Sequence, residues 1–409
     1  MENKKLILLT SSYPNYSGEY FLEDEIKILS QEFEEVLIFC FHQDGKKVNR
    51  EVPKNVKVID VPFYTSAMEN VKSILFILKK DVINEIRNVF KYFTSARFSF
   101  LTYKILFVEY LKAQKAHALL KNHLQNEDFS KLIFYSYWHD FKALALVEFT
   151  KSKKVSRAHG WDVDFIRHQP AYLPFKKLII ENLDKTFSIS NFGVENLLDR
   201  FNFKSSKKVT VSRLGKFNKR LLILEKNNNE VVFCSCSNLI PLKRVDLVIE
   251  ILSKLNHTVI KWFHFGEGEL REDLENIAAK KLLPKIEYKF MGSVPNHKIL
   301  DFYSENYIDF FINLSESEGI PVSIMEAQSA AIPVIATNVG GTSEIVNNQN
   351  GFLVGKDVDI NQLMLIIEKY LKLPLQIQKE KRLKSYQNWQ QHYDAAKNYR
   401  LFAKALKEI

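Results

Sequence analysis

Short apolar segments alternate with helical segments along most of the chain, and this alternation most limits what the chain can fold into. Residues 6–9, Leu-Ile-Leu-Leu, form the first apolar segment. A strand that is apolar on both faces is typical of a parallel sheet covered by helices on both sides. Parallel strands need crossover connections, and the intervening helical segments supply them. The sequence therefore predicts an α/β fold built on doubly wound parallel sheets.

The predicted elements fall into two groups, separated by a polar segment at residues 215–229 that we interpret as a linker. A chain of 409 residues exceeds what one ordinary core needs, so we expect two domains. The N-terminal domain covers residues 1–214 and the C-terminal domain covers residues 230–377. Residues 378–409 form one long helical pattern, which we expect to pack back toward the N-terminal domain. Strands are predicted at residues 5–10, 36–40, 56–61, 132–135, 154–158, 186–189, 209–212, 231–237, 258–265, 286–291, 309–313, 333–336 and 352–354.

A helical insertion at about residues 66–126 interrupts the first group of strands. Its apolar side chains recur at helical spacing from Val71 to Phe93, and lysines and arginines flank them. A helix packed on its own domain is the simpler interpretation. A helix that rests on an anionic membrane, or that shapes a cleft for an acceptor, fits the same pattern. The other helices are predicted at residues 19–31, 244–255, 269–280, 296–305, 321–330 and 360–371.

The formal net charge of +10 limits the classes of partner. Nucleic acid, anionic lipid and a phosphate-bearing substrate would each suit a basic protein, and a solvated lysine-rich surface would explain the charge equally well. No recognised nucleic-acid motif accompanies the charge, which disfavours nucleic acid. No stretch approaches the ~18 apolar residues of a membrane span. We therefore expect a cytoplasmic protein, either soluble or peripheral on the inner face of the cell membrane.

Residues 315–346, SESEGIPVSIMEAQSAAIPVIATNVGGTSEIV, are the most informative stretch. A predicted strand ends in a polar turn at Glu318 and Gly319, where glycine permits close approach of the backbone to a ligand. Pro321 suits the first position of the following helix, whose free N–H groups and dipole favour a phosphate. Glu326 lies about one turn inside that helix. Its carboxylate could accept two hydrogen bonds from a ribose diol.

This stretch resembles family 4 of the retaining glycosyltransferases, which have the GT-B fold of two Rossmann-like domains facing across a cleft. The family pattern is E-G, six residues, E-A, then P-V-I-A-T and G-G-x-x-E-I-V, and the sequence matches all of it. The resemblance implies a nucleotide-sugar donor in the C-terminal domain, with Glu326 on the ribose and Glu318 on the sugar. The donor diphosphate would lie at the helix start formed by Gly319, Ile320, Pro321 and Val322.

Other segments of the C-terminal half extend the resemblance. Lys243 matches the lysine that neutralises the donor diphosphate in the family, but Asn238 stands where the family usually has an arginine. That departure removes a fixed positive charge and two bidentate contacts. Either Lys243 suffices, or Arg244 or Arg213 compensates. Two glycine turns complete the implied donor site, at Gly266 under the donor and at Gly292 beside the base.

The N-terminal half carries an implied acceptor side. His159 follows a predicted strand in the segment S-R-A-H-G-W-D and resembles the histidine that approaches the donor sugar from the opposite domain in the family. A lone histidine is otherwise more often structural. The match places Trp161 and Asp162 on the acceptor side as well. The first strand-to-helix loop often holds two glycines in the family, and here it holds Gly18, followed by Glu19.

The implied reaction is transfer, with retention, from a nucleoside diphosphate sugar, expected to be a UDP-sugar, to a glycan or lipid-linked glycan acceptor in surface polysaccharide biosynthesis. Glu318, Lys243 and His159 would be the catalytic residues, and neither a metal nor a cofactor is expected. Asp-x-Asp tripeptides at residues 162–164 and 357–359 match the metal motif of GT-A enzymes but do not lie in the first nucleotide-binding half. A nucleotide-sugar epimerase of GT-B fold and a non-catalytic sugar-binding relative remain alternatives. No G-x-G-x-x-G follows the first strand, which disfavours a Rossmann dehydrogenase.

Overall fold

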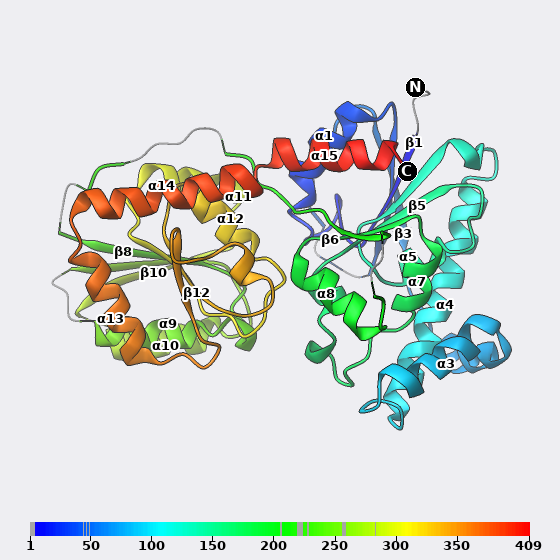
Figure 1. Cartoon of the computed structure of the whole chain (residues 1–409), viewed down its shortest axis with the longest axis horizontal. Coiled ribbons are helices and arrows are strands. Elements are labelled where there is room, and N and C mark those ends of the chain that lie inside the picture. Colours follow the sequence, from blue (N-terminus) through cyan, green and yellow to red (C-terminus); the bar gives the residue numbers. More distant parts are fainter. Residues whose placement is uncertain are drawn as a thin grey trace. The chain divides into compact units, whose positions relative to one another are not determined.

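A computed structural model describes residues 5–43, 45, 47–48, 50–204, 207–218, 224–226, 229–255, 259–282 and 284–409. The chain divides into two compact units (Figure 1), Met1–Arg213 with Ala396–Ile409, and Leu214–Ala395. The predicted linker at residues 215–229 falls partly outside the described residues, at 219–223 and 227–228. Its described part belongs to the second unit.

Parallel strands form the centre of the first unit. In its described part, seven strands pair in the order β3-β2-β1-β4-β5-β6-β7, and each neighbouring pair is parallel. All seven lie where the sequence predicts strands, with ends shifted by one or two residues. Their bounds are β1 Lys5–Thr10, β2 Val36–His42, β3 Val56–Pro62, β4 Leu132–Ser136, β5 Lys153–Ala158, β6 Lys185–Ser188 and β7 Val209–Val211.

Each face of this sheet buries a different apolar layer, because successive side chains of a strand point to opposite faces. Leu6 and Leu8 of β1 pack on one face with α1 and with Phe402 of α15. Figure 1 shows α15, in red, beside α1, in blue. Ile7 and Leu9 pack on the other face, against the remaining helices of the unit. The helices that cover the two faces have the bounds α1 Leu22–Glu32, α2 Ala67–Lys72, η1 Ser73–Leu78, α3 Lys80–Tyr92, α4 Phe100–His123, η2 Phe129–Lys131, α5 Phe141–Ala145, α6 Gly160–Val163, η3 Phe165–Arg167, α7 Lys176–Asn182, α8 Asn191–Arg200 and α15 Ala395–Lys407.

The predicted helical insertion consists of α2, η1, α3 and α4. Val82 and Val89 of α3 are buried in the core of the first unit, so the insertion packs on its own domain as the simpler interpretation holds. Glu85 lies on the same buried face and accepts hydrogen bonds from the Tyr172 hydroxyl at 2.9 Å and the Phe175 N–H at 2.8 Å. Burial raises the pKa of Glu85 to about 6. This carboxyl group therefore ties the insertion to the chain that leads into α7.

The second unit repeats the architecture. In its described part, six parallel strands pair in the order β10-β9-β8-β11-β12-β13. Figure 1 shows α9, α10 and α13 on one face of this sheet, and α11, α12 and α14 on the other. The bounds are β8 Val231–Cys236, η4 Pro241–Lys243, α9 Val245–Lys254, β9 Ile260–Phe265, α10 Arg271–Leu282, β10 Ile286–Gly292, α11 Asn296–Glu305, β11 Phe310–Asn313, α12 Val322–Ser329, β12 Val334–Thr337, η5 Thr342–Glu344, β13 Gly351–Val354, α13 Ile360–Leu371 and α14 Leu375–His392.

The C-terminal tail is two helices, so the prediction of one long helical pattern is wrong. The chain leaves α14 at Tyr393, whose carbonyl accepts a hydrogen bond from the Lys216 N–H at 3.0 Å. The Ala395 N–H then donates to the Lys216 carbonyl at 3.3 Å. Gly215 allows this approach, because a Cβ there would lie 2.6 Å from the Ala395 Cα. A backbone pairing with a distant segment therefore breaks the helix, and the helical periodicity of the tail carries no sign of it.

No helix among the residues that the structure describes is both long enough and apolar enough to cross a membrane.

A buried ion pair joins α1, β5 and α15 within the first unit. Arg157 Nη1 lies 2.5 Å from Glu25 Oε2, and both side chains are fully buried. The Tyr135 hydroxyl donates to the other carboxylate oxygen at 3.0 Å. The Phe402 ring of α15 covers the guanidinium at 4.0 Å. Loss of one partner would leave the other charge buried without compensation.

We predict that Arg157→Met destabilises the first unit by about 3–5 kcal/mol, because the Glu25 carboxylate would then be buried without its cation. Urea unfolding followed by circular dichroism measures the loss. Lys407→Ala is the matched control, since Lys407 pairs with Glu32 at 2.7 Å on the surface and should cost no more than about 1 kcal/mol. Equal stability of the two variants would contradict the prediction.

Candidate functional site

The second sheet reverses its winding between β8 and β11. Strands β9 and β10 extend from one side of β8, whereas β11, β12 and β13 extend from the other. Ligands of open α/β sheets bind at the carboxyl ends of the strands, at such a switch point. The loops that follow β8 and β11 therefore form the candidate site, and they carry Lys243 and Glu318.

Lys243 and Glu318 meet at this switch point. Lys243 ends the short η4 turn after β8, and its Nζ lies 2.6 Å from Glu318 Oε1. Asn313, the last residue of β11, donates to the same oxygen at 3.4 Å. Both charged side chains are mostly buried, with 19% and 12% of their surface exposed. The structure thus brings together the predicted diphosphate-binding lysine and the predicted sugar-binding glutamate.

Glu326 lies on the buried side of α12. Its Oε1 accepts a hydrogen bond from Asn296 Nδ2 at 2.6 Å and lies 3.5 Å from Lys216 Nζ. The helix begins at Val322, so Pro321 is its N-cap and not its first residue. The N–H groups of Ile324 and Met325 already bond the Pro321 carbonyl. The free donors of this helix are therefore those of its first residues, next to Gly319.

The loop after β12 presses against the Glu318 loop. A Cβ at Gly340, where φ is +53°, would lie 1.8 Å from the Glu318 carbonyl oxygen. The Gly341 N–H donates to the Gly319 carbonyl at 2.8 Å. Gly341 is followed by the single turn η5, Thr342–Glu344. These two glycines pack against the backbone of the Glu318 loop and thereby restrict the position of the Glu318 side chain.

Two further predicted positions are held by backbone packing. The Gly266 N–H donates to the Gly292 carbonyl at 2.9 Å. A Cβ on Gly266 would lie 1.9 Å from the Ser237 carbonyl oxygen, so no other residue fits there. The loop after β9 therefore lies directly against the loop after β8, next to Asn238, whose side chain is exposed.

Arg244 braces the backbone of this site. Its Nε donates to the Leu314 carbonyl at 2.6 Å, Nη1 to the Lys356 carbonyl at 2.9 Å and Nη2 to the Ser315 carbonyl at 3.3 Å. Three of the five guanidinium donors are thus committed to main-chain oxygens. This arrangement orients the loop after β11. Compensation by Arg244 for the arginine missing at Asn238 would require these bonds to rearrange.

The switch point of the first sheet lies between β1 and β4, and Glu19 occupies it. Its carboxylate accepts hydrogen bonds from three consecutive backbone N–H groups, those of Ser11 at 2.9 Å and of Ser12 and Tyr13 at 2.7 Å. Trp138 Nε1, after β4, donates to the same carboxylate. Consecutive N–H groups of this kind form an anion-binding concavity. Here the chain's own carboxylate fills it, a contact that no local sequence pattern predicts.

The fold-back of Glu19 depends on the backbone before it. Gly18 has a φ of +106° and Glu19 a φ of +49°, so two successive residues adopt left-handed conformations. A Cβ on Gly18 would also lie 2.9 Å from Ser12 Oγ. The Gly18-Glu19 dipeptide is the only local sign of this fold-back in the sequence, because the N–H groups that bind the carboxylate belong to another turn.

Lys142 is a buried cation at the same switch point that sequence reasoning missed. Its Nζ lies 2.9 Å from Ser11 Oγ and 2.6 Å from Asp140 Oδ2, and the side chain is 1% exposed. A lysine inside the apolar segment F-K-A-L-A-L is the signal that was available. Such a lysine is rarely buried unless a specific partner holds it.

His159 lies at the carboxyl end of β5, as predicted, but it is buried and neutral. Its ring stacks near Phe21, Tyr137 and Trp138. Burial, together with the charge of Arg157, lowers the pKa of His159 to about 3. Nε2 lies 3.0 Å from the Tyr137 carbonyl oxygen, which can only accept a hydrogen bond, so Nε2 carries the proton. Nδ1 is then the basic atom of the ring.

The two neighbouring residues predicted on the acceptor side differ in exposure. Asp162 is buried and accepts a hydrogen bond from the His159 N–H at 3.0 Å, and burial raises its pKa to about 6. It thus closes the first turn of α6. Trp161 is 56% exposed, and its ring meets the His168 ring at a centroid distance of 4.4 Å. Only Trp161 of this pair presents a broad surface to solvent.

The predicted Asp-x-Asp tripeptides serve local structure. Asp162 caps a turn, as described above, and Asp359 caps α13 by accepting from the Gln362 N–H at 3.1 Å. Among the residues that the structure describes, no group of three or more histidine, cysteine, aspartate or glutamate side chains is arranged to hold a metal ion.

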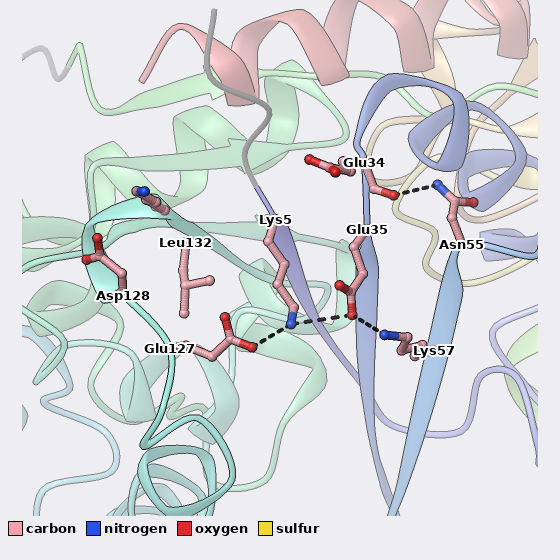
Figure 2. Close-up of a pocket in the computed structure, with 9 residues that line it drawn as sticks. Lys5, Glu34, Glu35, Asn55, Lys57, Glu127, Asp128 and Leu132 are labelled. Atoms are coloured by element: carbon pink, nitrogen blue, oxygen red, sulfur yellow. Dashed lines mark hydrogen bonds and ion pairs between the residues drawn. The ribbon is translucent and has the colours of Figure 1, made fainter.

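A separate pocket opens at the amino ends of the strands of the first sheet (Figure 2). Its charges are largely paired with one another: Lys5 Nζ lies 2.7 Å from Glu127 Oε1 and 3.4 Å from Glu35 Oε1, which also meets Lys57 Nζ at 3.1 Å. The opposite end of an α/β sheet carries ligands. We therefore do not assign the functional site to this pocket, which is lined by Lys5, Glu34, Glu35, Asn55, Lys57, Glu127, Asp128, Lys131 and Leu132.

The class of fold follows from a comparison with solved structures. HepE from Anabaena, solved in complex with UDP and glucose, matches with a TM-score of 0.65 at 15% identity, over 99% of this chain and 100% of that chain. At this identity the likeness shows the fold alone. The fold is GT-B, with two Rossmann-like α/β domains, as the sequence predicted.

Sequence comparison adds a likeness for the second unit. Residues 220–390 match the family model of the glycosyl transferases group 1. An uncharacterized glycosyltransferase of Methanocaldococcus jannaschii, MJ1178, is 30% identical over 203 residues, which are 49% of this chain and 53% of that protein. The O-antigen biosynthesis glycosyltransferase WbnH of Escherichia coli is 28% identical over 221 residues, 52% of this chain and 59% of that protein. The chain thus spans little more than half the length of these curated relatives.

We predict that His159 stays neutral, with its proton on Nε2, down to at least about pH 5, because its pKa of about 3 lies far below the ordinary 6.5. Its contribution to stability is therefore complete above pH about 6.5 and is lost as the pH falls toward 3. Long-range proton–nitrogen NMR spectra of the imidazole report both the charge and the tautomer. A doubly protonated ring at pH 6, or a proton on Nδ1, would contradict this environment.

Proposed function

We propose that this protein is a retaining glycosyltransferase of family 4 that moves a sugar from a nucleoside diphosphate sugar, most simply a UDP-sugar, to a glycan or lipid-linked glycan. The observation that carries the proposal is the Lys243–Glu318 pair at 2.6 Å, at the switch point of the second sheet and next to the start of α12. A cation, a carboxylate and free helical N–H groups together suit a sugar diphosphate.

Two comparisons support the nature of the substrates. WbnH is named for O-antigen biosynthesis, which suggests a surface glycan as the product. The structure of HepE was solved with UDP and glucose, which suggests a UDP-sugar as the donor. Both properties belong to those proteins, and for this chain they motivate the choice of donor and acceptor.

The proposed roles follow from the contacts in the second unit. Glu326 would accept hydrogen bonds from the ribose hydroxyls, while Asn296 and Lys216 hold its Oε1 in place. Glu318 would bind hydroxyls of the donor sugar. Lys243, together with the first N–H groups of α12, would stabilise the negative charge that develops on the departing diphosphate.

The proposed reaction breaks the bond between the anomeric carbon and the diphosphate oxygen and forms a bond from that carbon to an acceptor oxygen on the same face. The acceptor hydroxyl loses its proton to an oxygen of the departing diphosphate, so no separate base is required. The acceptor would bind at the carboxyl ends of the first sheet. There the exposed Trp161 ring can stack on a sugar, and His159 would keep the acceptor-side role that the resemblance implies.

We predict that Glu326→Ala weakens UDP binding by about 1.5–3 kcal/mol, the usual cost of losing a hydrogen bond to a charged group. Isothermal titration calorimetry measures the change, and Glu326→Gln should fall between the variant and the wild type. Glu316→Ala is the matched control, because that carboxylate lies in the same loop and is 51% exposed. Unchanged UDP binding by Glu326→Ala, or an equal loss in Glu316→Ala, would contradict the proposal that Glu326 binds the ribose.

A second prediction concerns metal. Release of nucleoside diphosphate from a panel of donors, with glycan acceptors present, should proceed equally in EDTA and in manganese, because Lys243 and α12 would supply the positive charge. Strict dependence on manganese would contradict the metal-free mechanism. Incubation of the donor alone distinguishes the rival class, since an epimerase converts the donor sugar without any acceptor.

A further inference from the structure

The helical insertion of the first unit carries an unusual number of exposed apolar side chains. Among the residues that the structure describes, 22 large apolar side chains are strongly exposed, and 11 of these lie between Met68 and Leu101. Isolated exposed apolar residues are normal, but a concentration of this kind marks an interaction surface. We call residues 67–101 the insertion surface.

In the first part of the insertion surface, packed and exposed side chains lie on different faces of a 3-10 turn. In the 3-10 turn η1, residues three apart share a face. Ser73 is buried, and the Phe76 ring packs on Tyr110 at a centroid distance of 5.2 Å. The other four residues of this turn point outward, and among them Leu75 is 75% exposed and Leu78 is 85% exposed. Ser73 and Phe76 therefore anchor the turn, and the rest of it faces solvent.

Helix α3 continues the same division. Its Val82 and Val89 are fully buried in the core. One residue further along, Ile83 and Phe90 are 36% and 47% exposed, and these two positions are separated by two helical turns. Arg87 lies between them at helical spacing on the same outer face. The outer face of α3 therefore alternates apolar and cationic side chains.

The turn after α3 adds the most exposed aromatic rings. Phe98 and Phe100 are 79% and 83% exposed. The Phe98 ring meets the Phe90 ring edge-on at a centroid distance of 6.2 Å, which joins the turn to the outer face of α3. The Arg97 guanidinium lies 4.9 Å from the Phe98 ring. Aromatic and cationic groups are thus adjacent at the surface.

The charge of the insertion surface is positive. Residues 67–101 contain six lysines and arginines and three acidic residues. Glu85 is buried in the core, and Glu69 is paired with Lys115 at 2.8 Å, so Asp81 is the remaining acid. The cations with exposed side chains are Lys72, Lys79, Lys80, Arg87 and Lys91.

We propose that the insertion surface docks on an anionic lipid bilayer, with its apolar side chains in the interface and its cations at the lipid headgroups. The mixture of residues favours this partner over a protein. Protein interfaces are depleted of lysine at their centre, whereas here lysines lie beside the apolar side chains on successive turns. Lysine side chains can reach headgroups while their stems cover apolar surface. This inference goes beyond the proposed transferase activity and does not depend on it.

Flotation with lipid vesicles tests the proposal. The full-length protein should float with phosphatidylcholine vesicles that contain phosphatidylglycerol, and raised salt should weaken its binding, because each cation adds electrostatic attraction. Leu75→Ser with Leu78→Ser should weaken the binding by about tenfold or more, since both side chains would lose their burial in lipid. The matched control is Leu365→Ser with Leu401→Ser, two exposed leucines outside the insertion surface, which should bind as the wild type does.

A site-specific label gives an independent readout. An environment-sensitive fluorophore on Leu78→Cys should shift to the blue on anionic vesicles, and the same fluorophore on Leu365→Cys should not. No flotation of the wild type, or equal flotation of the variant and its control, would overturn the proposal. Self-association that is lost in Leu75→Ser with Leu78→Ser, without vesicle binding, would also overturn it and assign the surface to a second copy of the chain.

Discussion

Parallel pairing of the strands in both sheets is the constraint on which the rest of the structure depends. A parallel sheet must be covered on both faces, so helices pack on both faces of each sheet and leave no open face for a ligand. The accessible backbone groups then lie in the loops at the strand ends. The reversal of winding between β8 and β11, and between β1 and β4, separates two such loops in each sheet. The candidate functional residues lie in these loops.

The two switch points are occupied in different ways. In the second sheet, Lys243 and Glu318 pair across the reversal, and Glu326 lies in the adjoining helix. These are groups of both signs that a charged ligand can engage. In the first sheet, the Glu19 carboxylate fills the anion-binding concavity of its own loop. Under the proposed function, the donor diphosphate would bind at the second sheet and the acceptor at the first.

The fold and the place of the candidate donor residues in it were largely predictable from the sequence, because local patterns determine both. Apolar segments without polar alternation located the strands, and the stretch from Ser315 to Val346 placed Glu318 and Glu326. The break between α14 and α15 was not predictable, because it depends on hydrogen bonds to Lys216, far away in the chain. The three hydrogen bonds that Arg244 donates to main-chain carbonyls were not predictable for the same reason. Hydrogen bonds to backbone groups that are distant in the sequence leave no trace in its hydrophobic periodicity.

The central claim is that a nucleoside diphosphate binds at the carboxyl ends of the second sheet. Hydrogen–deuterium exchange of the full chain, with and without UDP, tests it most directly, because ligand contacts slow the exchange of the backbone N–H groups they engage. The account predicts protection in residues 237–244, 315–326 and 338–344, and none at the amino ends of the first sheet. Protection confined to other segments, or no protection at saturating UDP, would contradict it.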